Sequence, residues 1–309
     1  MSKKSKILAK KIRIHVLNMT NVGKSSHIGS ILSIVDIVSV LYEHSLKFFS
    51  KNPKNDYRDR FILSKGHAGA AIYAVLAEKN FFPIKNLQTH CLNGSNLSGH
   101  VSHKDIPGVE LSTGSLGHGL SVGCGMALGA KRDKKKHRVI VLLSDGECDE
   151  GSNWESILFA SHHKLSNLIV VVDYNKLQSI KSTCETLNLE PFSDKWKSFG
   201  WEVKEVDGHD HDKIKKSLIR KKSSKEKPLC IIAHTIKGKG VSFMEHPGGM
   251  KKQKIYTWHA GAPNDQAFIK AQNELINKIK IKFNKMSLPL PKIININNKE
   301  YLNLNNNIE

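Results

Sequence analysis

The sequence lacks any apolar run long enough to span a membrane, so we expect no transmembrane segment. Residues 1–19 are basic but lack the long apolar core and small-residue cleavage site of a signal peptide. The five cysteines are widely spaced and form no CxxC pair, which argues against a disulfide framework and a zinc site. These absences predict a cytoplasmic protein with free thiols and no membrane association.

Aromatic residues and arginine are also scarce. Aromatic residues make up 7% of the chain, and six of the 48 basic residues are arginine. Proteins that read nucleic acids use arginine and interleaved aromatic platforms, so the net charge of +20 is weak support for nucleic-acid binding. The spread of lysine along the chain favours a solvated basic surface, with attraction of a phosphorylated substrate as the alternative.

The middle of the chain alternates apolar strands with helices. Residues 137–146 and 168–175 are short apolar runs that end in polar residues, as strands buried on both faces do. Residues 150–164, which lie between them, have helical periodicity and complete a βαβ unit with parallel strands. Because the alternation continues through residues 201–235, we predict an open, mostly parallel α/β sheet with helices on both faces.

The flanking segments complete the predicted architecture. Ser33 followed by Asp36 resembles a capping box and predicts a helix that runs to about Phe48. We assign residues 1–265 to the α/β domain and residues 266–309 to a C-terminal helix and an Asn-rich tail. We expect this tail to be poorly ordered unless a partner holds it. Further helices are predicted over residues 3–19 and 66–79.

Two polar residues follow the two central strands. In a parallel sheet, ligands bind beyond the carboxyl ends of the strands, where Asp145 and Asn175 stand. A carboxylate and an amide oxygen suit Mg²⁺ or Ca²⁺, which would complete its shell with phosphate oxygens, a carbonyl and water. Gly146 would let its backbone N–H approach a phosphate, beside the positive end of the helix near Glu150. The alternative is an ordinary Asp-Gly turn and an ordinary loop asparagine.

Small residues recur every four positions at Gly117, Ser121, Gly125 and Gly129. A helix carrying this stripe permits very close approach of another helix, either in the core or at a subunit interface. The preceding turn, residues 112–115, is suited to an anion or the edge of a cofactor. It is no dinucleotide fingerprint, because no strong strand precedes it.

Three histidines, His27, His67 and His100, lie in loops rich in glycine or serine. A single histidine is usually structural. Three of them, each beside a small residue and just before a helix or turn, predict binding of oxygen atoms or proton transfer near neutral pH.

These segments together resemble transketolase, specifically its N-terminal, diphosphate-binding half in the two-chain versions. The resemblance runs from about residue 10 to residue 265. The Asp-Gly pair with an asparagine thirty residues later is similar to the thiamine-diphosphate signature of that family. The matching segments include RDRFILSKGHA (58–68), PGVELSTGSLGHGLS (107–121), DYNKLQ (173–178), LEPFSDKWKSFGWEVKEVDGHD (189–210) and TIKGKGVSFME (235–245).

The resemblance implies thiamine diphosphate as cofactor, held through Mg²⁺ or Ca²⁺. Asp145 and Asn175 would ligate the metal by their side chains and Leu177 by its carbonyl. The remaining roles are also carried over from the family. Gly146 and His67 would contact the diphosphate, Gly114 and Leu116 would line the cofactor rings, and Glu150 would join an acidic network between active sites. His27, His67, His100 and His259 would face the substrate.

The sequence departs from the family pattern at four places. Ser144 replaces a glycine of the signature, SSHIGS replaces the commoner SGHxG, and SIKST replaces a small turn after DYNKLQ. The segment 246–257 is longer than expected, so His246 and His259 compete for the late active-site histidine. The flanking residues WHAGAP favour His259.

The resemblance also implies a partner. The glutamate that activates thiamine diphosphate lies in the family's pyrimidine-binding domain, which we expect on a separate C-terminal transketolase subunit, in a heterotetramer. The implied reaction transfers a two-carbon ketol unit between sugar phosphates. The rival interpretations are a subunit of a deoxyxylulose-phosphate synthase-like or keto-acid dehydrogenase-like enzyme, and a partner subunit that has lost catalysis. Nucleic-acid binding has neither a motif nor an aromatic platform behind it.

Overall fold

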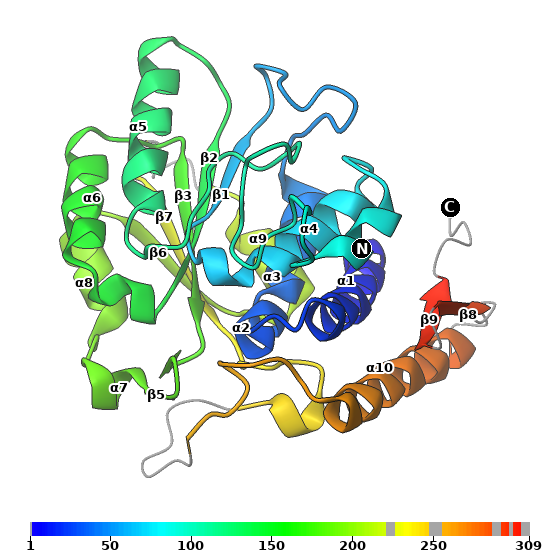
Figure 1. The fold of residues 1–309 in the computed structure, drawn as a ribbon. Coiled ribbons are helices and arrows are strands. Elements are labelled where there is room, and N and C mark those ends of the chain that lie inside the picture. Colours follow the sequence, from blue (N-terminus) through cyan, green and yellow to red (C-terminus); the bar gives the residue numbers. More distant parts are fainter. Residues whose placement is uncertain (1, 221–225, 247–254, 286–291, 297–298, 304–309) are drawn as a thin grey trace.

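The computed structural model describes residues 2–220, 226–246, 255–285, 292–296 and 299–303. Five parallel strands form the central sheet in the order β1-β2-β3-β7-β6 (Figure 1). Their bounds are Arg60–Leu63 (β1), Val139–Ser144 (β2), Leu168–Tyr174 (β3), Glu202–Asp207 (β6) and Leu229–His234 (β7). The predicted open parallel α/β sheet is therefore confirmed, and β1 is a strand that the apolar patterns did not reveal.

Helices cover both faces of this sheet (Figure 1). Strands β2 and β3 are buried on both faces, and alternate residues point to opposite faces. In β2, Ile140 and Leu142 join one core, while Val139 and Val141 join the other. The first core lies under α1 (Lys3–Val22), α3 (Val35–Val40), α4 (Gly69–Glu78) and α9 (His211–Ser217). The second lies under α5 (Gly119–Arg132), α6 (Gly151–His162) and α8 (Phe192–Ser198).

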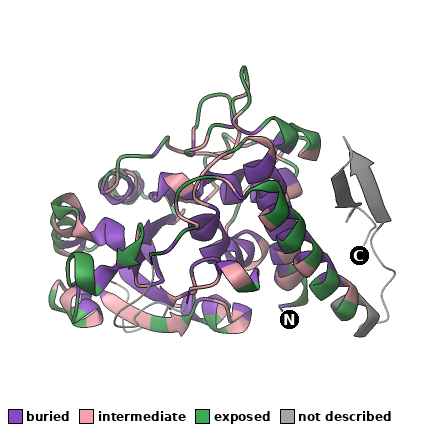
Figure 2. Cartoon of the chain, turned by 60° about the horizontal axis from the view of Figure 1, so that its bottom comes forward, coloured by how far each residue is buried: buried purple, intermediate pink, exposed green. Residues whose placement is uncertain are grey.

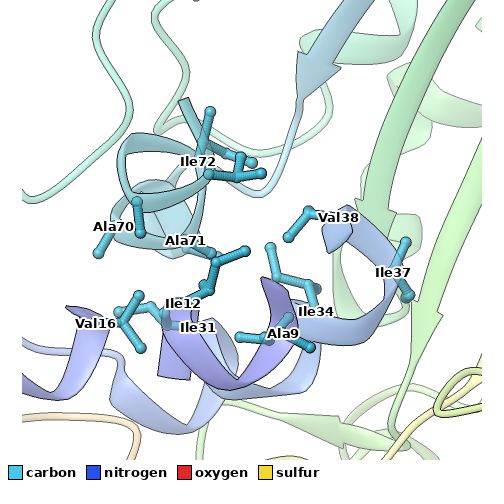
Figure 3. Packing of buried hydrophobic residues seen from close by; sticks show 14 of the residues in the cluster. Ala9, Ile12, Val16, Ile31, Ile34, Ile37, Val38, Ala70, Ala71 and Ile72 are labelled. Carbon is cyan, nitrogen blue, oxygen red and sulfur yellow. The ribbon is translucent and has the colours of Figure 1, made fainter. Parts of the chain in front are cut away.

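The first core is the larger, because a second layer of helices packs there. Ile12 and Val16 of α1, Ile31 of α2 (Ile28–Ser33) and Ala71 and Ile72 of α4 meet in one cluster (Figure 3). Each of these side chains is at most 2% exposed. Burial of a side chain such as isoleucine contributes about 1.5–3 kcal/mol. The cluster therefore holds α1, α2 and α4 against one another.

The C-terminal helix α10 (Asp265–Lys285) packs against α1. Phe268 and Leu275 are buried, whereas Ile269 is exposed, so α10 is amphipathic (Figure 2). Beyond it, residues 292–296 pair antiparallel with residues 299–303. The expectation that the Asn-rich tail is poorly ordered unless a partner holds it stays a prediction. The remaining elements are β4 (Leu177–Gln178), β5 (Lys181–Ser182), α7 (Thr183–Thr186), β8 (Lys292–Ile296), β9 (Lys299–Asn303) and the short turns Leu41–Ser45, Gly66–Ala68, Ile84–Thr89, Gly146–Asp149 and Ser242–Met244.

The capping box predicted at Ser33 is wrong. Helix already begins at Ile28, and Ser33 is the last residue of α2, where its hydroxyl donates to Asp173 Oδ1 (2.7 Å). Asp36 accepts two hydrogen bonds from Arg13 (3.1 and 2.6 Å) instead of capping a helix. Long-range polar partners therefore displaced the local motif. None of the described helices is long and apolar enough to cross a membrane.

Two glycines of α5 have opposite surroundings. A Cβ on Gly123 would lie 2.6 Å from Val141 Cγ2, so the close approach of α5 to β2 requires glycine there. A Cβ on Gly125, two residues along the same helix, would meet nothing within 4 Å. Of the small residues that the sequence singled out, Gly125 and Gly129 face open space, whereas a Cβ on Gly117 would lie 2.5 Å from Ser152 Oγ. The tight contact with β2 falls on Gly123, which lies outside that set.

We therefore predict opposite effects for two matched substitutions. Gly123→Ala overpacks the contact with Val141 and lowers the free energy of unfolding by about 1–3 kcal/mol. Gly125→Ala raises it by about 0.5–1 kcal/mol, because alanine loses less conformational entropy in a helix. Urea unfolding followed by circular dichroism measures both, and changes of the same sign would contradict this packing.

Candidate cofactor site at the carboxyl ends of the strands

Register brings the two predicted metal ligands to one edge of the sheet. Strands β2 and β3 are parallel, with Ser144 paired to Asp173, so Asp145 and Asn175 follow at the same end. The backbone N–H of Asp145 donates to the carbonyl of Asp173 (3.3 Å). Both side chains are buried, with Asp145 0% and Asn175 3% exposed.

The carboxylate of Asp145 is held by backbone donors. Its Oδ1 accepts from Gly146 N (2.8 Å), and its Oδ2 accepts from the N–H of Lys176. Burial and the neighbouring Asp173 raise the pKa of Asp145 to about 7. A cation beside this carboxylate would therefore relieve an unfavourable burial of negative charge.

The amide of Asn175 is oriented by its neighbours. Its Nδ2 donates to Asp173 Oδ2 (3.1 Å), which assigns the other amide atom as oxygen, and Oδ1 accepts from Leu177 N (3.0 Å). The carbonyl of Leu177 is close to the ammonium group of Lys237 (3.4 Å). The segment that follows β3 thus supplies an amide oxygen from Asn175 and a carbonyl from Leu177, and the end of β2 supplies the carboxylate of Asp145, which is hydrogen-bonded to Lys176 N.

These three oxygen atoms suit a hard cation whose remaining ligands come from outside the protein. Within the described residues, no group of three or more His, Cys, Asp or Glu side chains could hold a metal. One carboxylate and two neutral oxygens match Mg²⁺ or Ca²⁺ completed by phosphate oxygens and water. Gly146 has a steric role that the sequence did not reveal, because a Cβ there would lie 2.8 Å from Gln178 Cγ. Its backbone N–H donates a hydrogen bond to Asp145 Oδ1.

Four histidines form a cluster. The ring of His27 lies 5.2 Å from that of His67, 5.5 Å from His100 and 5.0 Å from His259, between centroids. The rings of His67 and His259 are 6.1 Å apart. The histidines predicted for one substrate site therefore come together, although they are separated by up to 232 positions in the chain. His246 instead stacks edge-on against Tyr256, at 5.6 Å.

Backbone hydrogen bonds fix the loops that carry these rings. His27 N donates to the carbonyl of His259 (3.0 Å), and Gly29 N donates to that of Trp258 (3.2 Å). His27 has φ of 75°, a left-handed conformation that is uncommon for a residue with a side chain. Such strained residues concentrate at functional sites, where the surroundings hold them in place.

Burial favours the neutral form of three of these imidazoles, those of His27, His67 and His259. It lowers the pKa of His27 to about 4 and that of His259 to about 3, with nearby cationic groups adding to the effect. Burial also holds the pKa of His67 well below its usual value. A neutral imidazole both donates and accepts a hydrogen bond, which suits the hydroxyl groups of a sugar.

Two buried lysines were missed by the sequence reasoning. Lys65 is 1% exposed and forms an ion pair with Asp173, and Lys237 is 2% exposed. Burial and the charge of Lys65 lower the pKa of Lys237 to about 8. Lys237 Nζ donates to the carbonyl of Ser179 (3.1 Å) and lies over the ring of Tyr256 (5.3 Å). Both lysines occur in motifs singled out above, SKGHA and TIKGKG, but burial of a lysine leaves no mark on the sequence.

The other predicted cofactor contacts lie on or beside the loop that precedes α5. Gly114 is exposed beside His100, since a Cβ on it would lie 3.4 Å from His100 Cδ2. Leu116 is half-buried in the same loop. Glu150 is exposed at the start of α6, and its side chain lies against Gly117. Their roles toward the cofactor stay predictions.

The fold and this edge define a protein class: an open parallel α/β domain that binds its ligand beyond the carboxyl ends of the strands. Residues 4–287 match the family model of the transketolase thiamine diphosphate binding domain. The chain belongs to this family, as the N-terminal type of subunit found in two-chain transketolases.

Relatives and solved structures agree with this assignment. An apulose-4-phosphate transketolase subunit of Phocaeicola vulgatus is 38% identical over 271 residues, 88% of this chain and 93% of that protein. The 6-deoxy-6-sulfo-D-fructose transketolase subunit of a Clostridium species is 42% identical, over 75% of this chain and 85% of its own length. The crystal structure of Campylobacter jejuni transketolase matches with a TM-score of 0.78 at 30% identity, covering 88% of this chain and 43% of that one.

The lowered histidine pKa values predict a pH dependence of stability. Below its ordinary pKa of 6.5, His67 binds a proton in the unfolded chain but not in the folded one. This contribution to stability is therefore complete above pH 6.5 and is lost as the pH falls. We predict that His67→Gln loses less thermal stability than the wild type between pH 7.5 and pH 5.

The control is His162→Gln, on the exposed side of α6, which should follow the wild type over this range. The quantity compared between variants is the slope of the thermal midpoint against pH, not the midpoint itself. Carboxylates such as Asp145, which change stability in the opposite sense, are present in every variant, so a difference in slope reports on His67. Identical pH slopes for His67→Gln and the wild type would contradict a neutral buried imidazole.

Proposed function

We propose that the chain is the diphosphate-binding subunit of a two-chain, thiamine-diphosphate-dependent transketolase. It transfers a two-carbon ketol unit from a ketose phosphate to an aldose phosphate. The observation that carries this proposal is the placement of Asp145, Asn175 and the Leu177 carbonyl at one sheet edge, with the four-histidine cluster in the same chain.

In this proposal the sheet edge holds the tail of the cofactor. Asp145, Asn175 and the carbonyl of Leu177 would hold Mg²⁺ or Ca²⁺, which would offset the negative charge of the diphosphate. Lys237 is buried beside the Leu177 carbonyl and would add positive charge next to the diphosphate. The raised pKa of Asp145 supports this role, since a buried carboxylate gains most from a cation that replaces its lost hydration.

The histidine cluster would handle the sugar. When bound, thiamine diphosphate supplies the nucleophilic carbon that carries the two-carbon unit. His27, His67, His100 and His259 would hold the substrate hydroxyls around that position and exchange protons with them. The lowered pKa values of His27 and His259 keep these two rings neutral, so that each can both donate a hydrogen bond to a hydroxyl and accept one from it.

A second polypeptide would complete the site. The chain spans 43% of the solved transketolase, and the two relatives named above are themselves called subunits. The partner would carry the pyrimidine-binding domain and its activating glutamate. The face of α5 around Gly125 and Gly129, where added Cβ atoms would meet nothing, is available for that association.

The first test is complementation. The purified chain alone should show no ketol transfer with thiamine diphosphate, Mg²⁺ and sugar phosphates, because in this proposal the partner supplies the activating glutamate. Adding the partner subunit should give turnover that saturates at a fixed subunit ratio. Turnover by the chain alone, or none with any pyrimidine-domain partner from the same source, would overturn the proposal.

The second test removes the charge of the metal ligand. Asp145→Asn should weaken Mg²⁺-dependent thiamine diphosphate binding to the assembled enzyme by at least about 100-fold, since even changes behind the ligands cost about 10–100-fold.

Isothermal titration calorimetry gives the affinity, and Asp194→Asn on the exposed surface of α8 is the control. Equal affinity of Asp145→Asn and wild type would exclude Asp145 as the anchor.

A further inference from the structure

One buried carboxylate joins three loops at the edge of the sheet. Glu147 is 0% exposed, and its Oε1 accepts from Gly117 N (3.1 Å) and from the hydroxyl of Ser64. Its Oε2 accepts from Ser144 N (3.2 Å). The donors therefore come from three segments that are far apart in the chain.

Each of these segments carries a different part of the proposed site. We call residues 64–68 the histidine loop, residues 111–117 the ring-side loop and residues 144–149 the metal loop. Ser64 leads into His67, Gly117 follows Leu116, and Ser144 precedes Asp145. The contacts of Glu147 thus lie directly behind all three groups of predicted site residues.

Packing around Glu147 leaves little freedom for these loops. Gly119 N donates to the hydroxyl of Ser64 (3.1 Å), and a Cβ on Gly119 would lie 2.3 Å from that oxygen. The backbone carbonyl of Glu147 accepts from Asn153 Nδ2 (2.6 Å), which anchors the metal loop to α6. The backbone of Glu147 is therefore fixed to α6, while its side chain holds the histidine loop and the ring-side loop.

We propose that Glu147 is a positioning residue, which keeps the ring-side and histidine loops in register with the metal loop so that both ends of one cofactor fit. This inference rests on the proposed function. The chemistry requires a carboxylate: it offers only acceptors to the three donors, whereas a glutamine must turn its NH₂ group toward at least one of them. A buried donor left without an acceptor is costly, so the loop concerned moves away.

The test uses the enzyme assembled with its partner subunit, and thiamine diphosphate with saturating Mg²⁺ as the probe. Glu147→Gln should raise the dissociation constant by about 10–100-fold, as for other residues behind a metal site. Glu226→Gln removes the same charge from an exposed side chain and should bind like the wild type.

Hydrogen exchange separates positioning from general stability. In Glu147→Gln without cofactor, the amides of Gly117 and Ser144 should exchange faster, while the amide of Val141 in the middle of β2 stays protected. Faster exchange throughout β2 and β3 would show a purely structural role and overturn the inference.

Ser64→Ala keeps the test decisive if Glu147→Gln does not fold. It removes one donor and leaves the carboxylate in place, so we expect a smaller, several-fold loss of affinity. If either variant folds and binds like the wild type, the inference fails and the proposed function stands. If the wild-type complex itself does not bind thiamine diphosphate, the proposed function fails, and the inference falls with it.

Discussion

The buried carboxylate of Asp173 is the constraint on which the site depends. It lies at the end of β3 with no exposure and forms an ion pair with Lys65, which follows β1. It also accepts hydrogen bonds from Ser33, Thr235 and Asn175. Burial alone would raise the pKa of Asp173, but these partners outweigh it and lower the pKa. Removing the charge of Lys65 would leave the buried carboxylate without its counter-ion, at a cost of about 3–5 kcal/mol.

The sequence predicted the parts of the fold whose signal is local. Strands β2 and β3 are continuous apolar runs because both of their faces are buried, and polar residues mark where each strand ends. That pattern was sufficient to place Asp145 and Asn175 at one edge. The histidines were found because small residues flank them, and His259 joined them only through the family resemblance.

The residues that the sequence did not reveal are those whose role comes from tertiary contacts. Lys65 and Lys237 look like surface lysines until the fold buries them, and Glu147 looks like part of an acidic turn. Ser33 shows the opposite case, in which a local motif is misleading. Its spacing to Asp36 matches a capping box, but its hydroxyl donates a hydrogen bond to Asp173. Strand β1 has only four residues, too short for its alternation to be distinguished from a loop.

The central claim is that Asp145, Asn175 and the Leu177 carbonyl together anchor a metal and, through it, a diphosphate. Mn²⁺ replaces Mg²⁺ at oxygen-rich sites and can be located by anomalous diffraction. In crystals of the assembled enzyme grown with Mn²⁺ and thiamine diphosphate, we predict one anomalous peak within about 2.0–2.3 Å of these three oxygens and of two phosphate oxygens. A diphosphate bound at another edge of the sheet, or a peak that omits Asp145, would contradict the account.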